Sequence, residues 1–92
     1  MELRLNGSIV VQALTMNGTA AQIPTTNLNS RKSMLIRNNG AATIFLGWSN
    51  VTTSTGYPLK AGEQLPMAIN ENCKLYGITA GTDVEIRVME AI

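Results

Sequence analysis

The sequence predicts an all-β fold: a small single-domain β-sandwich of about seven or eight short antiparallel strands. Turn-forming residues recur at short intervals, and the segments between them are short and rich in Val, Ile, Thr and Leu. Several of these segments alternate apolar and polar residues, a period of two that is typical of strands with one buried face. Closely spaced strands of this kind indicate a sandwich or a barrel rather than alternating strands and helices.

The clearest strand covers residues 82–89. Val84, Ile86 and Val88 share one face, and the charged residues between them share the other. Residues 64–70 alternate in the same way, but Pro66 lies on their polar side. Because proline cannot donate a hydrogen bond to a neighbouring strand, this segment is predicted to be an edge strand or to contain a bulge.

Residues 33–38 and 43–47 are predicted strands joined by a hairpin connection over residues 38–42, in which Gly40 can take a positive φ. Both strands are apolar almost without interruption, and residues 74–79 share this property. A strand that is apolar on both faces is either central in a sandwich or half covered by a partner.

The N-terminal third of the chain is harder to assign. Residues 8–16 fit one helical face through Ile9, Val10, Ala13 and Leu14, but β-branched residues and the Asn-Gly turn that follows favour a strand. Residues 25–32 are polar and are predicted to form a loop or an extended arm. The chain is therefore interpreted as one domain over residues 1–92, with an extended N-terminal arm or loop placed within residues 1–32.

The composition limits the classes of partner. Of the 92 residues, 45% are apolar and only 14% are charged, with a formal net charge of +1. An average soluble domain has about 25% charged residues, so neutral Asn and Thr must supply much of this surface. Binding to nucleic acid requires clustered Lys and Arg, and none is expected. A thin core in a small, weakly charged domain favours self-association or docking onto a larger assembly.

The inventory of reactive side chains argues against an enzyme. The chain has no His and one Cys, Cys73, so His-based triads, the usual zinc sites and an internal disulfide are excluded. Cys73 has no neighbouring base and is expected to be a buried, inert thiol. The carboxylates are expected to be solvated. Asp83 and Glu85 share a face, which is compatible with calcium and equally with a solubilising stripe, so no metal or cofactor is predicted.

No segment has the pattern of a signal peptide or the apolar length of a membrane span, so a soluble protein made inside the cell is expected, with no membrane partner.

Five residues are candidate interface anchors. Arg31 and Lys32 are the only adjacent basic pair, and Arg37 follows on the next strand. They could grip an acidic surface or the backbone carbonyl groups of a partner, or simply be solvated at the start of a strand. Trp48 leaves a strand into a Ser/Thr/Asn loop, where it could cap the core, anchor an interface or stack on a sugar. Tyr57 follows the same loop and is grouped with Trp48.

An ordered set of short motifs runs from Ile23 to Glu90. It comprises Ile23-Pro24, residues 29–40 (NSRKSMLIRNNG), residues 43–47 (TIFLG), residues 49–52 (SNVT), residues 56–59 (GYPL), residues 61–63 (AGE), residues 74–78 (KLYGI) and residues 84–90 (VEIRVME). In this order and at these spacings, the set resembles small virion proteins of tailed bacteriophages, of the capsid decoration or cement type. The resemblance covers about the C-terminal three quarters of the chain, and residues 1–16 match less well.

The resemblance implies a jelly-roll sandwich that decorates or cements the outer capsid surface, without catalysis or a cofactor. It implies the major capsid protein as partner, a virion location after synthesis in the host cytoplasm, and a homo-oligomer, with a trimer favoured. The alternative is a host-adhesion or carbohydrate-binding module of a head fibre or tail, which would use Trp48, Tyr57 and the loop between them.

Overall fold

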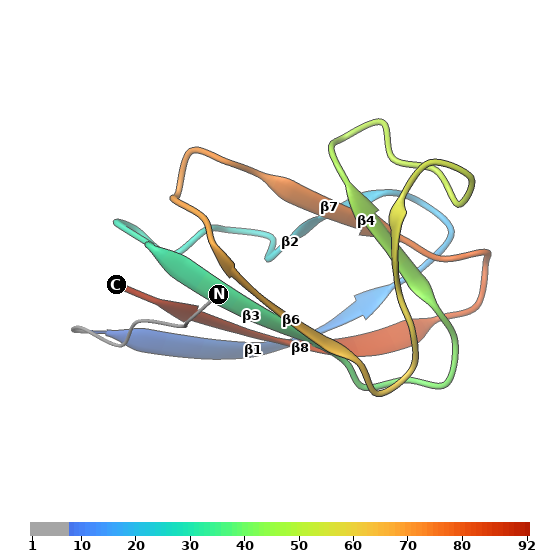
Figure 1. Cartoon of the computed structure of the whole chain (residues 1–92), viewed down its shortest axis with the longest axis horizontal. Helices are drawn as coiled ribbons and strands as arrows, with labels where there is room; N and C mark the ends of the chain where they lie inside the picture. Colours follow the sequence, from blue (N-terminus) through green and yellow to red (C-terminus); the bar gives the residue numbers. More distant parts are fainter. Residues whose placement is uncertain (1–7) are drawn as a thin grey trace.

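The computed structural model describes residues 8–92, which form two antiparallel four-stranded sheets packed face to face (Figure 1). In chain order the strands are β1 (Ile9–Met16), β2 (Ala21–Ile23), β3 (Ser33–Asn38), β4 (Ile44–Gly47), β5 (Tyr57–Leu59), β6 (Gln64–Ala68), β7 (Leu75–Ile78) and β8 (Val84–Ala91). The first sheet has the order β1-β8-β3-β6, and the second has the order β2-β7-β4-β5.

The pairing of the strands is that of a jelly roll. β1 pairs with β8, β2 with β7, β3 with β6 and β4 with β5, always antiparallel. The chain is therefore one long two-stranded ribbon folded over on itself. The additional pairs β3–β8 and β4–β7 close this ribbon into two sheets, which confirms the predicted all-β sandwich.

The core lies between the sheets and is almost entirely aliphatic. Along β8 the side chains of Val84, Ile86 and Val88 are buried, whereas Glu85 and Arg87 are exposed, as the alternation predicts. The other buried apolar residues of the core cluster are Met16, Ile23, Met34, Ile36, Ile44, Leu46 and Leu59. Burial of these side chains supplies the main driving force that holds the two sheets together.

The strands that are apolar on both faces are central strands. β3 has the predicted bounds and lies between β8 and β6, while β4 and β7 each have a neighbour on both sides. β6 is an edge strand, and Pro66 lies within it as predicted. β5, one of the two edge strands of the second sheet, contains Pro58. The prolines of β5 and β6 each remove a hydrogen-bond donor from an edge that could otherwise pair with another chain.

The predicted hairpin over residues 38–42 is wrong. β3 belongs to the first sheet and β4 to the second, so this connection crosses from one sheet to the other. Gly40 does not have a positive φ, and only Gly62 and Gly81 do among the described glycines. A Cβ at position 40 would lie 2.8 Å from Cγ1 of Val84, so close approach to β8 explains this glycine.

The N-terminal region is mostly part of the sandwich. Residues 9–16 form β1, as favoured over the helix, and pair with β8 along their whole length. Residues 24–32 contain no strand, in agreement with the predicted loop. Residues 9–16 and 21–23 therefore belong to the sheets and not to an extended arm. Residues 1–7, which also fall within the predicted arm region, lie outside the described residues.

Candidate interaction surfaces

The five candidate anchors lie on more than one part of the fold, and Trp48 and Tyr57 flank the same loop. Arg31 precedes β3 and is buried, whereas Lys32 and Arg37 are exposed. Trp48 follows β4 and Tyr57 begins β5, and these side chains are 70% and 61% exposed. The structure therefore does not bring the five residues together into one site.

The guanidinium of Arg31 is held inside the fold by four hydrogen bonds to oxygen atoms. Its Nη1 donates to Oε2 of Glu90 at 2.9 Å and to Oδ1 of Asn27 at 3.1 Å. Its Nη2 donates to the backbone carbonyl oxygens of Asn70 at 2.9 Å and Cys73 at 2.7 Å. These bonds join the β2–β3 loop, the β6–β7 loop and β8 at one end of the sandwich. Arg31 is therefore a structural residue.

Burial of this ion pair corrects two expectations. Both interpretations of Arg31 require an exposed side chain, but Arg31 and Glu90 are each 1% exposed. The expectation of a solvated Glu90 is also wrong, because its Oε2 is buried and accepts a further hydrogen bond from the backbone N–H of Leu28 at 3.0 Å. Glu90 has the same phase along β8 as Val88, and continuing the alternation by one more step would have predicted its burial.

An apolar row crosses the outer face of the first sheet. Val11 lies opposite Met89, Met89 lies opposite Leu35, and Leu35 lies opposite Pro66. These four residues, which we call the apolar row, have the opposite phase to the core residues of their strands, so their side chains point outward. Val11 is 62% exposed, and Ile9 on the same strand is 48% exposed.

A shallow hollow of about 200 Å³ lies along the apolar row. Its lining combines apolar and polar residues: Val11, Leu35, Val88 and Met89 with Arg37, Gln64 and Arg87. The sequence indicated this surface only indirectly, through strands that are apolar on both faces. On β3, core-facing side chains account for one apolar face, and Leu35 of the apolar row accounts for the other.

One ion pair lies at the charged side of this face. Oε1 of Glu85 accepts hydrogen bonds from Nη1 of Arg87 at 2.7 Å and from Nδ2 of Asn39 at 3.1 Å. The hydrogen bond from Arg87 is the main cause that lowers the pKa of Glu85, followed by the bond from Asn39. Glu85 therefore stays ionised at neutral pH and engages Arg87 on this surface.

The loop between β4 and β5 holds Trp48 away from the core. Val51 is buried, and its backbone N–H donates to the carbonyl oxygen of Trp48 at 2.9 Å. Further along, the hydroxyls of Thr52 and Thr55 lie 2.9 Å apart. Val51 is the loop residue that reaches the core, and Trp48 faces solvent. The interpretation of Trp48 as a cap on the core is therefore wrong, while the interface and sugar-stacking interpretations stay predictions.

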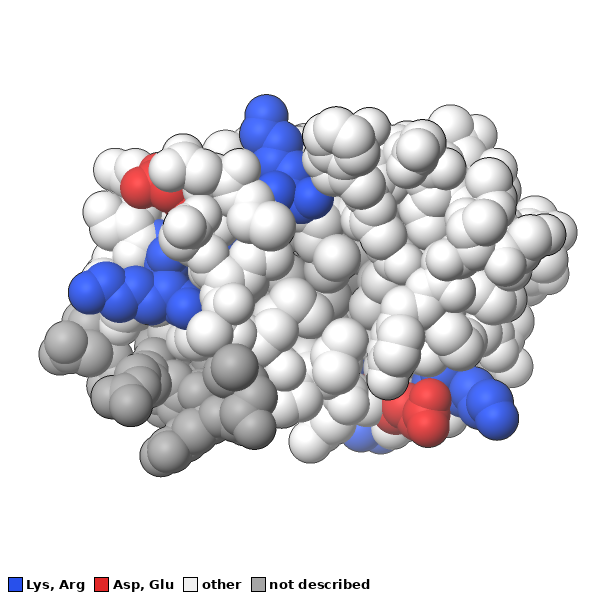
Figure 2. Space-filling view, turned by 45° about the horizontal axis from the view of Figure 1, so that its top comes forward, with Lys and Arg blue, Asp and Glu red and all other residues white. Residues whose placement is uncertain are grey.

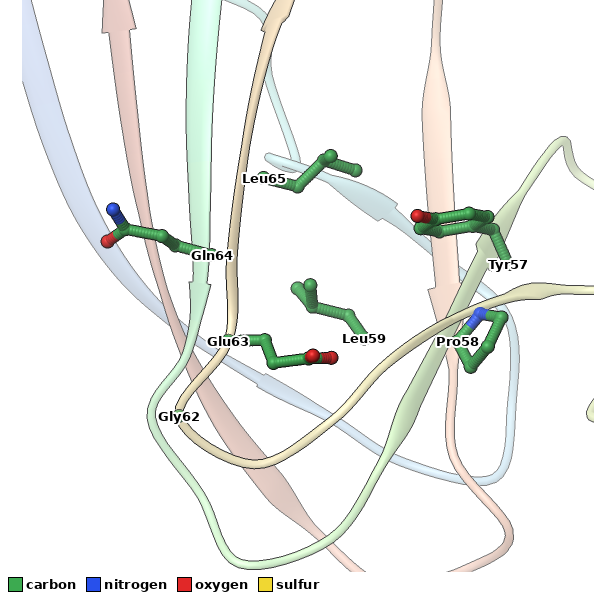
Figure 3. A pocket seen from close by; sticks show the side chains of 7 residues that line it. All are labelled: Tyr57, Pro58, Leu59, Gly62, Glu63, Gln64 and Leu65. Carbon is green, nitrogen blue, oxygen red and sulfur yellow. The ribbon is translucent and has the colours of Figure 1, made fainter.

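A second hollow, of about 340 Å³, lies where the edge strands β5 and β6 leave the sandwich open. Figure 3 shows the side chains of Tyr57 and Leu65 pointing toward each other across it, with Leu59 below them. The carboxylate of Glu63 is directed toward the hollow, whereas Gln64 turns away from it. Oε1 of Glu63 is held by the backbone N–H of Lys60 at 2.7 Å. This hollow thus combines an aromatic ring with a positioned carboxylate.

The charged residues are few and lie outside the strands of the second sheet. None of its four strands contains Lys, Arg, Asp or Glu. Figure 2 shows one face of the molecule with a few charged groups and a broad uncharged area between them. Contacts made through this area would therefore depend on apolar packing and neutral hydrogen bonds.

Cys73 is exposed, so the expectation of a buried thiol is wrong. It follows the β6–β7 turn, where its backbone N–H donates to Oδ1 of Asn70 at 3.2 Å.

Within residues 8–92, no group of three or more His, Cys, Asp or Glu side chains is placed to hold a metal ion. In the same part of the chain, no helix has the length and apolar character needed to cross a bilayer.

Comparisons of the chain with protein-family models, with curated proteins and with solved structures found no match.

Proposed function

We propose that this chain is a structural virion protein that decorates and cements the outer surface of a tailed-phage capsid. Two observations of different kinds support the proposal. The ordered motifs between Ile23 and Glu90 resemble proteins of that type, and the strand order is that of a jelly roll. Jelly rolls serve as capsid domains and also as lectin domains, so the fold alone does not decide the function.

The observation that carries the proposal is the apolar row on the first sheet. The sheet packs its inner face against the core and leaves Val11 and its neighbours on the outer face in contact with water. Exposed apolar surface on a sheet with a polar rim is typical of protein–protein interfaces. Because the row crosses all four strands, it offers a contact that extends across the whole sheet, which suits docking on a shell.

Cementing requires binding energy but no chemical step. A protein that contacts several capsid subunits at once must be released before those subunits can separate, so modest contacts act at high effective concentration. A net charge of +1 keeps repulsion between crowded copies small. Association of the chain with itself, with a trimer favoured, would add further contacts to each shell site.

The direct test uses shells of the encoding phage prepared without this protein. Adding the purified chain is expected to raise the temperature at which the packaged genome is released. Val11→Asn should weaken that protection, because a polar side chain interrupts the apolar row. Thr53→Asn in the exposed β4–β5 loop is the matched control and should protect as the unaltered chain does. Equal release temperatures with and without the chain would contradict cementing.

Host adhesion through carbohydrate is the second candidate function, and the exposure of Trp48 and Tyr57 is the observation that favours it. Exposed aromatic rings next to hydroxyl-rich loops can stack on sugar faces. If the chain binds host glycans, its tryptophan fluorescence should shift saturably on titration, and Trp48→Ala should abolish the shift. No shift with a panel of host surface glycans would remove this candidate and leave the cement proposal standing.

A further inference from the structure

Two arginines lie side by side on the outer face of the first sheet. Arg37 on β3 is directly opposite Arg87 on β8, and both side chains are exposed. Like charges directly opposite each other on neighbouring strands repel, which makes this pairing unfavourable in the isolated protein. The arrangement indicates a role other than stability.

Only one of the two guanidinium groups has a carboxylate partner. Arg87 is paired with Glu85 at 2.7 Å, whereas Arg37 makes no side-chain hydrogen bond or ion pair within residues 8–92. The residue opposite Arg37 on the other side is Gln64 of β6, which is uncharged. Among the described residues the local balance is therefore two cations and one anion, so one further carboxylate would complete the group.

Apolar surface adjoins the arginines. The hollow of about 200 Å³ is lined by Arg37, Arg87 and Gln64 together with Val11, Leu35 and Met89 of the first sheet. A ligand that is only an anion would leave this apolar part unused. A ligand that is only apolar would leave Arg37 without a partner.

We propose that this hollow binds a segment of the shell protein that presents one carboxylate flanked by apolar side chains. The carboxylate lies between the guanidinium groups of Arg37 and Arg87 and accepts hydrogen bonds from them, and Gln64 offers a neutral donor beside it. The apolar side chains cover Val11, Leu35 and Met89. This inference rests on the proposed function for the identity of the partner, and on the charge balance of this face for its chemistry.

A nucleic acid fits this surface less well than a protein segment. Binding to a phosphate backbone uses many cations in a row, whereas residues 8–92 place one uncompensated guanidinium on this face, beside apolar side chains. Guanidinium groups bind carboxylates through paired hydrogen bonds of fixed geometry, which gives specificity as well as affinity. The combination selects an acidic residue in an apolar setting.

The experiment measures binding of the purified chain to shells that lack it, by co-sedimentation at two salt concentrations. Arg37→Gln is expected to weaken binding on the order of tenfold or more and to reduce its salt dependence, since one charge-assisted contact is lost. Arg87→Gln should act in the same direction. Lys74→Gln removes the same charge from the exposed β6–β7 region and is the matched control that should bind as the unaltered chain does.

Thermal unfolding of the same variants separates binding from folding. Arg37→Gln should leave the melting temperature unchanged or raise it, because it relieves repulsion from Arg87. If the unaltered chain does not bind shells at all, the proposed function fails. If it binds shells and Arg37→Gln binds equally well, the proposed function stands and the carboxylate site is refuted.

Discussion

Replacing Glu90 with glutamine is expected to lower the free energy of unfolding by about 3–5 kcal/mol, because it leaves Arg31 as an uncompensated buried cation. The glutamine keeps the size of the side chain and removes only its charge. Oε2 of Glu90 accepts hydrogen bonds from Arg31 and from the backbone of Leu28, so the substitution weakens both. Small domains are stable by roughly 5–15 kcal/mol, so chemical denaturation should detect the loss readily.

The matched control is Glu85→Gln on the same strand. Glu85 also has an arginine partner, but the side chains of that pair, Arg87 and Glu85, are 43% and 49% exposed. An exposed ion pair contributes about 0–1 kcal/mol, so this variant should unfold close to the unaltered chain. Equal losses for the two variants would contradict the structural role assigned to the buried pair.

A double variant that removes both charges of the Arg31–Glu90 pair tests whether the loss comes from leaving one charge unpaired. Nε of Arg31 and Oε1 of Glu90 have no hydrogen-bond partner among the described residues, so the cost of burying the two charges is not fully offset. Replacing both together, as Arg31→Met with Glu90→Leu, should recover much of the stability lost in Glu90→Gln. Chemical denaturation of the double variant beside the single one measures the recovery, and a further loss of stability would contradict this interpretation.

Replacing Asn38 with alanine is expected to lower the free energy of unfolding by about 2–4 kcal/mol, because this buried side chain makes three hydrogen bonds that lose their partner. Nδ2 of Asn38 donates to the carbonyl oxygens of Ala42 at 2.8 Å and Leu59 at 2.9 Å. Its Oδ1 accepts from the backbone N–H of Gly40 at 3.0 Å. The side chain thus fixes the crossing between the two sheets and attaches it to β5.

Asn39→Ala is the matched control for this prediction. Asn39 is the same residue type at the next position, but it is exposed and its side chain reaches only Glu85. Its replacement should change the free energy of unfolding little. If Asn38→Ala lowered the free energy of unfolding as little as Asn39→Ala does, the crossing between the sheets would not depend on the Asn38 side chain.

The strands were predictable where burial alternates or is continuous over several residues. β8 shows the period of two directly, and β3 was predicted with its observed bounds, because a central strand between two neighbours is apolar on both faces. Pro66 indicated an edge strand or a bulge because its missing donor is tolerated at those places, and the structure shows an edge strand. β2 and β5 are three residues each, too short for any periodicity, and they were not identified as strands.

The connection after β3 was not predictable because Asn-Asn-Gly is typical of tight turns in general. Whether such a turn joins paired strands or carries the chain to the other sheet depends on contacts made by residues far apart in sequence. The bond from Asn38 to Leu59 and the approach of Gly40 to Val84 are contacts of this kind. No local pattern contains that information.

The candidate surface was only partly predictable, for a similar reason. Arg37 and Trp48 are exposed as a partner-binding role requires, but Arg31 is buried because Glu90 and the carbonyl oxygens of the β6–β7 loop meet at its position. The Arg37–Arg87 neighbourhood depends on the register of β3 against β8. The sequence does not show the register between strands that are so far apart along the chain. It does show, through the alternation, on which face of its strand each residue lies.

Electron microscopy of the particle that the encoding genome produces tests the central claim most directly. The account predicts density for a jelly-roll domain on the outer capsid surface, at junctions between capsid subunits, with the outer face of the first sheet toward the shell. Density for the domain only on a tail or fibre would favour adhesion instead. Particles without any such density, in cells where the chain is made in quantity, would contradict the claim that it works as part of a virion.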